Sequence, residues 1–205
     1  IKGEQAKQLV DDAQKTQLMQ EIYRVLKPGG RIAISDIVSD DPVPAHLKQD
    51  NALWSGCISG AFQEKVFIDV FAQAGFLAMS YDKWDTSPWR VVEGIEFRSV
   101  TLTATKGEDA PCLDYGHAVI YRGPHASIVD DEGNVFPRGA RMAVSKRTYQ
   151  LLTESSVYAD NFIGVESAQK HEPVPFNVPI GTRRSTAETK STLHNAGHKN
   201  GNCCC

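Results

Sequence analysis

Apolar residues recur at helical spacing near the start of the chain, between residues 4 and 26. The residues of this apolar face are Leu18, Met19, Ile22, Val25 and Leu26. The motif LKPGG then ends the predicted helix, because proline cannot continue a helix and glycine can cap its C terminus. The apolar run over residues 31–38 predicts a buried strand of the parallel type. Asp36 is placed at its carboxyl end, where α/β sheets bind ligands.

A second helical pattern covers residues 63–76. Val66, Val70 and Phe71 lie on its predicted apolar face, and Gly75 is placed to cap it. This pattern is clearer than the one before it, where residues 45–55 predict only a short helix. The chain therefore begins with helices and strands in alternation, which is typical of an α/β fold.

Strands are predicted after this helix, over residues 76–84 and 97–107. The composition shifts near residues 107–111, and short strands between turn signals then predict a small β-rich unit. A helix capped by Ser145 follows. From about residue 171 the apolar periodicity is lost, and we expect that tail to be disordered.

Composition narrows the class of protein. The chain has 205 residues, of which 41% are hydrophobic, and a net charge of -3. No basic excess favours nucleic acid as a partner, and no apolar run of 18 residues predicts a membrane span. The five cysteines are an odd number at spacings that fit no small disulfide scaffold. Free thiols indicate a reducing compartment, so we expect a cytoplasmic protein.

The stretch EIYRVLKPGGRIAISD resembles the late part of class I methyltransferases that use S-adenosylmethionine, although an αβ turn of another α/β protein is an alternative. In that family the donor binds a Gly-rich loop far upstream of this motif. Here Gly3 is the only glycine before Gly29. We therefore expect most of the cofactor site to be missing from this chain, and no appreciable binding of S-adenosylmethionine.

A narrower resemblance comes from WSGCISGA and CLDYGHAVIYRGP, which follow LKPGG in that order. Together they resemble the arsenite S-adenosylmethionine methyltransferases, over roughly residues 17–166. The resemblance implies that Cys57 and Cys112 bind trivalent arsenic. Thiolate suits this soft metalloid, and the arsenic lone pair stays free to attack a sulfonium methyl group. The alternative for Cys57 is a small buried hydrophobic residue.

The resemblance implies a fold of class α/β: a truncated class I methyltransferase (Rossmann-like) portion followed by a small α+β arsenic-binding domain. We place the methyltransferase remnant at residues 1–40, the arsenic-binding domain with the late sheet strands at 41–170, and a disordered tail at 171–205. The implied function is arsenite methylation in arsenic detoxification. The family uses a third cysteine from the cofactor-binding half, so we expect this chain alone to be inactive.

The expected partners are arsenic(III) as a thiol complex and thioredoxin or glutathione as reductant. We expect a monomer, with no nucleic acid and no membrane span. The rival hypothesis is a non-catalytic thiol module that binds arsenic(III) or another soft metal without methyl transfer.

The remaining candidates are weaker. Cys203, Cys204 and Cys205 form a terminal run of thiols that could bind a soft metal, carry a lipid or have no function. His117 could support the Cys112 site through a hydrogen bond, or be a surface strand residue. Trp54, Trp84 and Trp89 could line a pocket or pack in the core.

Overall fold

The computed structural model describes residues 12–107, 111–155, 157–167 and 172–189. The chain divides into two compact units, Ile1–Asp109 and Ala110–Cys205. The boundary lies where the composition shifts, whereas the predicted boundary at residue 40 falls inside the first unit. The assignment of residues 41–170 to an arsenic-binding domain stays a prediction.

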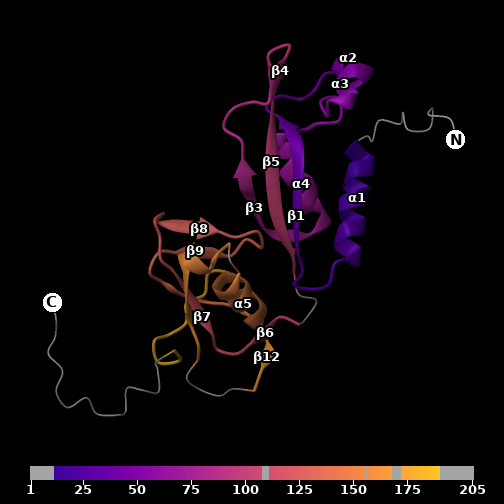
Figure 1. The fold of residues 1–205 in the computed structure, drawn as a ribbon. Helices are drawn as coiled ribbons and strands as arrows, with labels where there is room; N and C mark the ends of the chain where they lie inside the picture. Colours follow the sequence, from indigo (N-terminus) through magenta and orange to yellow (C-terminus); the bar gives the residue numbers. More distant parts are fainter. Residues whose placement is uncertain (1–11, 108–110, 156, 168–171, 190–205) are drawn as a thin grey trace. The chain divides into compact units, whose positions relative to one another are not determined.

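The first unit is built on one mixed sheet with the strand order β2-β1-β5-β3, in which β4 also pairs with β5 (Figure 1). Its strands are β1 (Arg31–Ser39), β2 (Phe62–Gln63), β3 (Phe76–Trp84), β4 (Arg90–Val92) and β5 (Ile95–Lys106). The predicted strands at 76–84 and 97–107 are confirmed. In β5, Val100, Leu102 and Ala104 share one buried face.

Strand β1 differs from the prediction in three ways. It pairs antiparallel with β5 along its whole length and parallel with β2 at Val38 and Ser39 only, because an apolar run does not fix the direction of the neighbouring strand. Only Val38 and Ser39 are buried, so the prediction of a buried strand was wrong for residues 31–37. The strand also continues to Ser39, which places Asp36 within it, where the carboxylate accepts a 2.8 Å hydrogen bond from the Ile37 amide.

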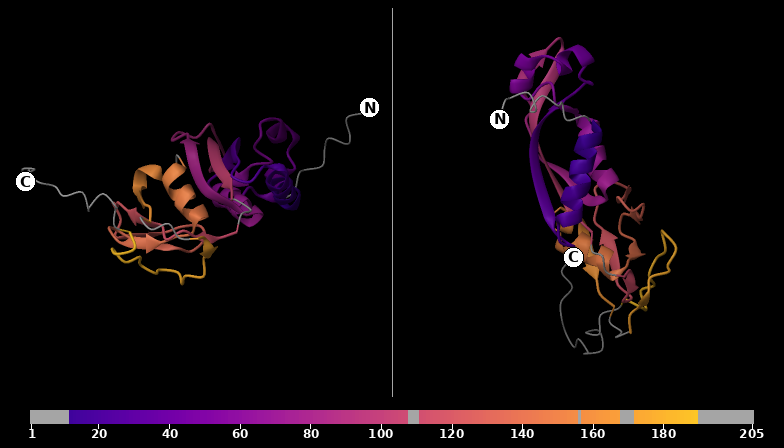
Figure 2. Two further views of the ribbon diagram at one scale, coloured as in Figure 1. Left: turned by 90° about the horizontal axis from the view of Figure 1, so that it is seen from below. Right: turned by 90° about the vertical axis from the view of Figure 1, so that its right-hand side faces the viewer.

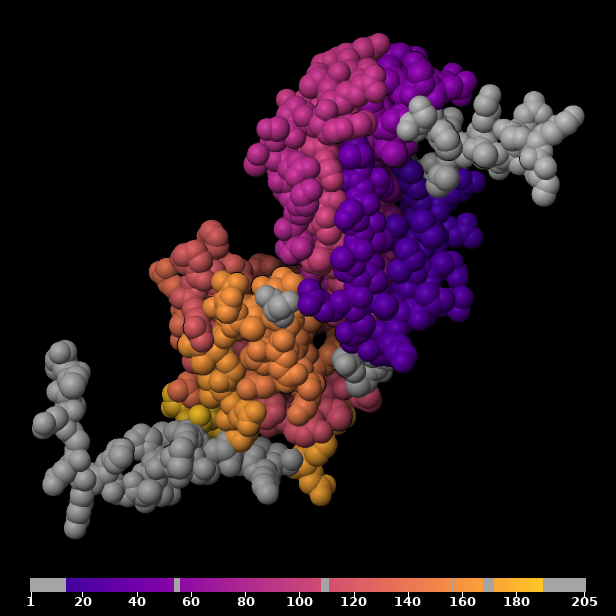
Figure 3. Space-filling view, viewed as in Figure 1, coloured from indigo at the N-terminus to yellow at the C-terminus, as the bar shows by residue number. Residues whose placement is uncertain are grey.

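Helices α1 (Asp12–Val25) and α4 (Glu64–Ala74) cover one face of this sheet side by side (Figure 2). In a space-filling view, α1 and β1 form one continuous indigo surface of this unit (Figure 3). The predicted apolar faces are confirmed in part: Met19, Val70 and Phe71 are buried, whereas Leu18, Val25 and Val66 are exposed. Met19 and Phe67 are buried, at 6% and 1% exposure, whereas Leu18 and Val66 are 53% and 40% exposed. Gly75 caps α4 with φ 96°, as predicted.

The predicted helix at 45–55 is split into α2 (Ala45–Lys48) and α3 (Asn51–Ser55). Asp50 explains the break, because its carboxylate accepts hydrogen bonds from the amides of Ala52 (2.7 Å) and Leu53 (3.3 Å). This is the bonding that starts a new helix rather than continuing an old one. A second apolar cluster lies here and includes Leu47, Leu53, Ile58 and Phe97.

The second unit is rich in short strands, as predicted. The sheet β10-β7-β11 is accompanied by the hairpin β8-β9 and the pair β6-β12. The strands are β6 (Leu113–Asp114), β7 (Ala118–Tyr121), β8 (Ser127–Val129), β9 (Val135–Pro137), β10 (Arg141–Ala143), β11 (Phe162–Val165) and β12 (Val174–Pro175). Helix α5 (Lys146–Glu154) packs against β11, followed by the short helix η2 (Ala159–Asn161). Ser145 caps α5 by accepting a 3.1 Å hydrogen bond from the Thr148 amide.

Residues 172–189 were expected to be disordered, and the structure differs. Strand β12 pairs with β6, the Ala143 amide donates to the Thr182 carbonyl at 2.9 Å, and Thr189 is only 4% exposed. The segment is held by backbone pairing and charged side chains, which leave no apolar period in the sequence. The remainder of the predicted tail, with Cys203, Cys204 and Cys205, lies outside the described residues. Among the helices that are described, none is long and apolar enough to cross a membrane.

Replacing Gly30 with alanine should destabilise the first unit. A Cβ at this position would lie 2.7 Å from the Lys27 carbonyl oxygen and 2.8 Å from a Leu26 carbon, so the turn would have to shift. Overpacking of this kind costs about 1–3 kcal/mol. Gly60→Ala is the matched control, because a Cβ there meets nothing within 4 Å. Urea unfolding should separate the two variants, and equal midpoints would contradict the strained turn.

Candidate functional site: two exposed thiols

Cys57 is exposed at the end of a tight turn that follows α3. The amides of Gly56 and Ile58 both donate to the Leu53 carbonyl, at 3.1 and 3.0 Å. Ile58 is fully buried, and the buried Ser59 hydroxyl donates to the Leu47 carbonyl at 2.8 Å. The turn is therefore anchored on both sides of a solvent-facing thiol. The alternative of a buried hydrophobic cysteine does not describe this residue.

The backbone of Cys57 has φ 59°, in the left-handed region that residues with a Cβ avoid. Such a conformation costs about 1–2 kcal/mol and persists where the surrounding structure imposes it. Here the anchors at Leu53 and Ile58 impose it. The strain aims the thiol away from the core, which is consistent with a functional role for the sulfur.

Trp89 and Arg90 lie beside this turn. A Cβ built on Gly56 would be 3.5 Å from Arg90 Nη1 and 3.8 Å from the indole of Trp89. The Trp89 side chain is 56% exposed, so it does not pack in the core. An exposed indole and a guanidinium therefore border the residue that precedes Cys57.

Cys112 belongs to the second unit and is also exposed. Its carbonyl accepts a 2.8 Å hydrogen bond from the Phe176 amide, directly before β6 pairs with β12. The two predicted arsenic ligands are thus exposed cysteines, one in each unit. Their convergence on one arsenic stays a prediction.

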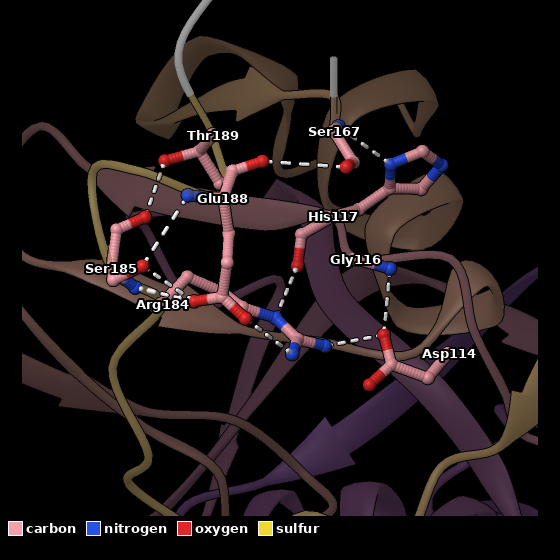
Figure 4. A network of polar contacts seen from close by, with 8 residues as sticks. All are labelled: Asp114, Gly116, His117, Ser167, Arg184, Ser185, Glu188 and Thr189. Carbon is pink, nitrogen blue, oxygen red and sulfur yellow. Dashed lines mark hydrogen bonds and ion pairs between the residues drawn. The ribbon is translucent and has the colours of Figure 1, made fainter. Parts of the chain in front are cut away.

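Charged and polar side chains surround the stretch that follows Cys112 (Figure 4). Arg184 pairs with Asp114, and its Nε donates to the His117 carbonyl at 3.4 Å. Sequence reasoning missed Arg184 because it lies in the segment expected to be disordered. Asp114 was within the quoted CLDYG motif, but nothing in the sequence marked its partner.

His117 serves the fold of this unit. Its Nδ1 accepts a 3.2 Å hydrogen bond from the Ser167 amide, which requires a neutral ring nitrogen there. The ring lies between Tyr115 and Tyr149, at centroid distances of 5.8 and 4.7 Å. It is half-buried directly before β7 and bonded to Ser167, so it is not a surface strand residue, and its support of the Cys112 site stays a prediction.

Acid should weaken the second unit through this histidine. Burial lowers the pKa of His117 below its usual value. The charges of Lys146 and Arg184 also lower this pKa, whereas those of Glu166 and Asp114 raise it. The unfolded chain then binds this proton more readily than the folded one. Stability is therefore fully present above about pH 6.5 and is lost as the pH falls through the folded-state pKa.

Urea midpoints of the second unit between pH 7.5 and pH 5 measure the effect. His117→Gln should flatten the pH dependence, whereas His125→Gln, at an exposed histidine, should leave it unchanged. An equal slope in all three proteins would contradict the role assigned to His117.

The glycines of LKPGG form a structural turn. The Gly29 amide donates to the Lys106 carbonyl at 3.1 Å, and the Gly30 amide donates to the Lys27 carbonyl at 2.9 Å. Both amides are therefore committed within the protein and are not free to bind a cofactor. The turn ties the end of α1 to the end of β5.

A pocket of about 90 Å³ lies in the first unit. Its lining residues are Pro42, Val43, Lys48, Ala61, Phe62, Gln63 and Val66. Pockets for drug-sized ligands span about 300–1,000 Å³, so this one is too small for S-adenosylmethionine. The described residues also include no group of three or more histidine, cysteine or acidic side chains arranged to hold a metal ion. Neither this pocket nor the bonded amides of Gly29 and Gly30 offers a place for the methyl donor.

Comparison with known proteins shows which families and proteins this chain is similar to. Residues 5–75 match a family model described as a methyltransferase domain, and residues 108–194 match one described as a domain of unknown function. Arsenite methyltransferase from Aquipseudomonas alcaligenes is 30% identical over 175 residues, which cover 77% of this chain and 49% of that protein. The human arsenite methyltransferase is 37% identical over 163 residues, covering 73% and 42%. This chain is a homologue of the arsenite methyltransferases.

The chain spans about half the length of the curated arsenite methyltransferases it matches. A solved structure of an arsenic(III) S-adenosylmethionine methyltransferase from Chlamydomonas reinhardtii is 25% identical and covers 78% of this chain and 57% of that one. Its TM-score of 0.43 is too low to establish a shared fold. The family resemblance of the sequence motifs is confirmed, and so is a methyltransferase domain with a mixed α/β sheet. The arsenic-ligand roles of Cys57 and Cys112 stay predictions.

Proposed function

We propose that this chain supplies two thiolate ligands for trivalent arsenic, Cys57 and Cys112, in a protein that methylates arsenite with S-adenosylmethionine. The observation that carries the proposal is the strained, anchored turn that exposes the Cys57 thiol. A cysteine that only packed the core would be buried, whereas Cys57 is exposed. The homology to arsenite methyltransferases supports the choice of arsenic as the ligand.

Two sulfur ligands suit the chemistry. Arsenic(III) is soft and thiophilic, and thiolate is the softest ligand that a protein offers. With sulfur on one side, the arsenic lone pair points away from the protein ligands. The methyl donor, when bound, supplies an electrophilic methyl group, and the thiols of this chain hold and orient the nucleophile.

Arsenic would arrive as a thiol complex and exchange its ligands for the protein thiols. A reductant such as thioredoxin or glutathione would keep both cysteines reduced. The need for reduced thiols favours action in the reducing cytoplasm, in arsenic detoxification, and we propose that the chain acts as a monomer.

A second candidate is a thiol module that binds arsenic(III) or another soft metal without transferring methyl groups. The bonded amides of Gly29 and Gly30 and the small pocket of the first unit favour it, because neither feature offers a place for the methyl donor. Both candidates use the same two cysteines. They differ in whether a methyl group is transferred to the bound arsenic.

Methyl transfer decides between the two candidates. The full chain is incubated with arsenite, glutathione and S-adenosylmethionine labelled in its methyl group, and the arsenic species are identified by mass. Labelled methylarsenic from wild type and none from Cys57→Ser would support the enzyme. Arsenic binding without labelled product would support the module, and neither binding nor product would remove both.

A further inference from the structure

Residues Thr182–Thr189 form a segment that we call the clasp. The side chain of Arg184, which belongs to the clasp, reaches the stretch that follows Cys112 and is almost buried there (Figure 4). Its side chain is 11% exposed and that of its partner Asp114 is 12% exposed. Nη2 pairs with the Asp114 carboxylate, and Nε donates to the His117 carbonyl at 3.4 Å. One guanidinium therefore grips two points of the same short stretch, a geometry that the single ammonium of lysine cannot reproduce.

The clasp presents Arg184 from a fixed backbone. The Arg184 amide donates to the Arg141 carbonyl of β10 at 2.9 Å. Arg141 Nη1 in turn donates to the Thr189 hydroxyl at 2.7 Å, at the other end of the clasp. Both ends of the clasp are thus tied to the strand that pairs with β7.

The interior of the clasp is ordered by Glu188. Its Oε2 accepts from the Ser185 amide at 2.9 Å and from the Ser185 hydroxyl at 2.7 Å. These hydrogen bonds hold the pKa of Glu188 below its usual range, so the carboxylate is charged at neutral pH. Its Oε1 lies 3.9 Å from Arg184 Nη1, on the side away from Asp114.

Asp114 connects the ion pair with Arg184 to the backbone near the Cys112 thiol. It lies two residues after Cys112, and its Oδ1 also accepts a 2.7 Å hydrogen bond from the Gly116 amide, which closes a turn. Strand β6, which contains Asp114, pairs with β12, and the Phe176 amide donates to the Cys112 carbonyl at 2.8 Å. The backbone that carries the exposed thiol is therefore held by β12 on one side and by Arg184 through Asp114.

We propose that Arg184 is a positioning residue for the Cys112 thiol. The inference rests on the proposed function, in which two thiols must meet one arsenic in a narrow geometry. A ligand held by supporting contacts binds better than a mobile one, because less motion is lost on binding. Arg184 contacts Asp114 and His117, and it acts by fixing the stretch from Cys112 to His117.

The test uses the full chain with Cys203, Cys204 and Cys205 replaced by serine, so that only Cys57 and Cys112 bind. Arg184→Gln is compared with Arg183→Gln, a change of the same kind at the exposed neighbouring arginine. Amide hydrogen exchange reports the backbone, and the dissociation rate of a trivalent phenylarsenical reports the thiols. For Arg184→Gln we expect exchange over residues 112–118 and arsenical release each to rise about tenfold, the scale of a broken ion-pair network.

The pattern of change separates positioning from a general structural role. Positioning predicts faster exchange confined to residues 112–118 and 174–189, with the melting of β7 and β11 little changed. Arg184→Lys should recover only part of the loss, and Arg183→Gln should match wild type. Faster exchange throughout the unit, or no change in exchange and release, would overturn the proposal.

Asp114→Asn keeps the test decisive if Arg184→Gln does not fold. Asparagine retains an oxygen for the Gly116 amide but removes the charge that attracts Arg184. A folded Asp114→Asn chain with wild-type exchange and release would overturn the proposal. If wild type fails to bind the arsenical, the proposed function fails, and the exchange measurements alone decide the role of Arg184.

Discussion

Cys57→Ser will bind a trivalent phenylarsenical at least about a hundredfold more weakly than wild type, because the second sulfur adds its bond within one molecule. The phenylarsenical needs two thiolates, and serine supplies none. Since Cys57 is exposed and serine is nearly isosteric, the fold should survive. Fluorescence or calorimetric titration of the chain with serine at positions 203–205 measures the affinity.

Cys112→Ser is the matched variant, and the proposed site requires it to lose affinity by a similar factor. Its thiol is also exposed, so the same argument for an intact fold applies. Wild-type affinity in either variant would show that the arsenical is bound by other groups. Loss of affinity in one variant alone would reduce the site to a single thiol.

Phe71→Ala will lower the free energy of unfolding of the first unit by about 3–5 kcal/mol, the usual cost of removing a buried aromatic ring. Phe71 is fully buried, with ring centroids 5.4 Å from Phe67 and 5.7 Å from Phe76. Val66→Ala on the same helix is the control, because Val66 is 40% exposed. Its cost should stay below about 1 kcal/mol, the range of surface changes.

Urea unfolding followed by the circular dichroism of the first unit measures both variants. The comparison also tests the phase of α4, since the sequence pattern had grouped Val66 with Val70 and Phe71. Equal losses at Val66 and Phe71 would restore that predicted phase and contradict the packing in the structure.

Local patterns predicted α4, β3 and β5 well, because their boundaries carry glycine, a cap or a clear alternation. The helix phase was harder. Apolar residues stand next to each other at Leu18 and Met19, and a period of three to four residues fits either one. Packing against the sheet chooses Met19, which no local pattern can show.

The direction of β1 and the order of the clasp lie beyond local sequence for the same physical reason. The paired residues of β1 and β5 run from Ser39 and Phe97 to Arg31 and Thr105, far apart in the sequence, and Arg184 and Asp114 are 70 positions apart. Neither contact leaves a period in the sequence. The two cysteines could be predicted because their motifs resemble those of a known family. The contacts that support them, such as that of Arg184 with Asp114, are visible only in the structure.

The stoichiometry of arsenic on the two thiols tests the central claim most directly. The full chain with serine at positions 203–205 is titrated with a trivalent phenylarsenical and then treated with iodoacetamide, and peptide masses report which cysteines are alkylated. The proposed site predicts one arsenic per chain, with Cys57 and Cys112 protected together and in proportion. Two arsenic atoms per chain, or protection of one cysteine while the other is alkylated freely, would contradict it.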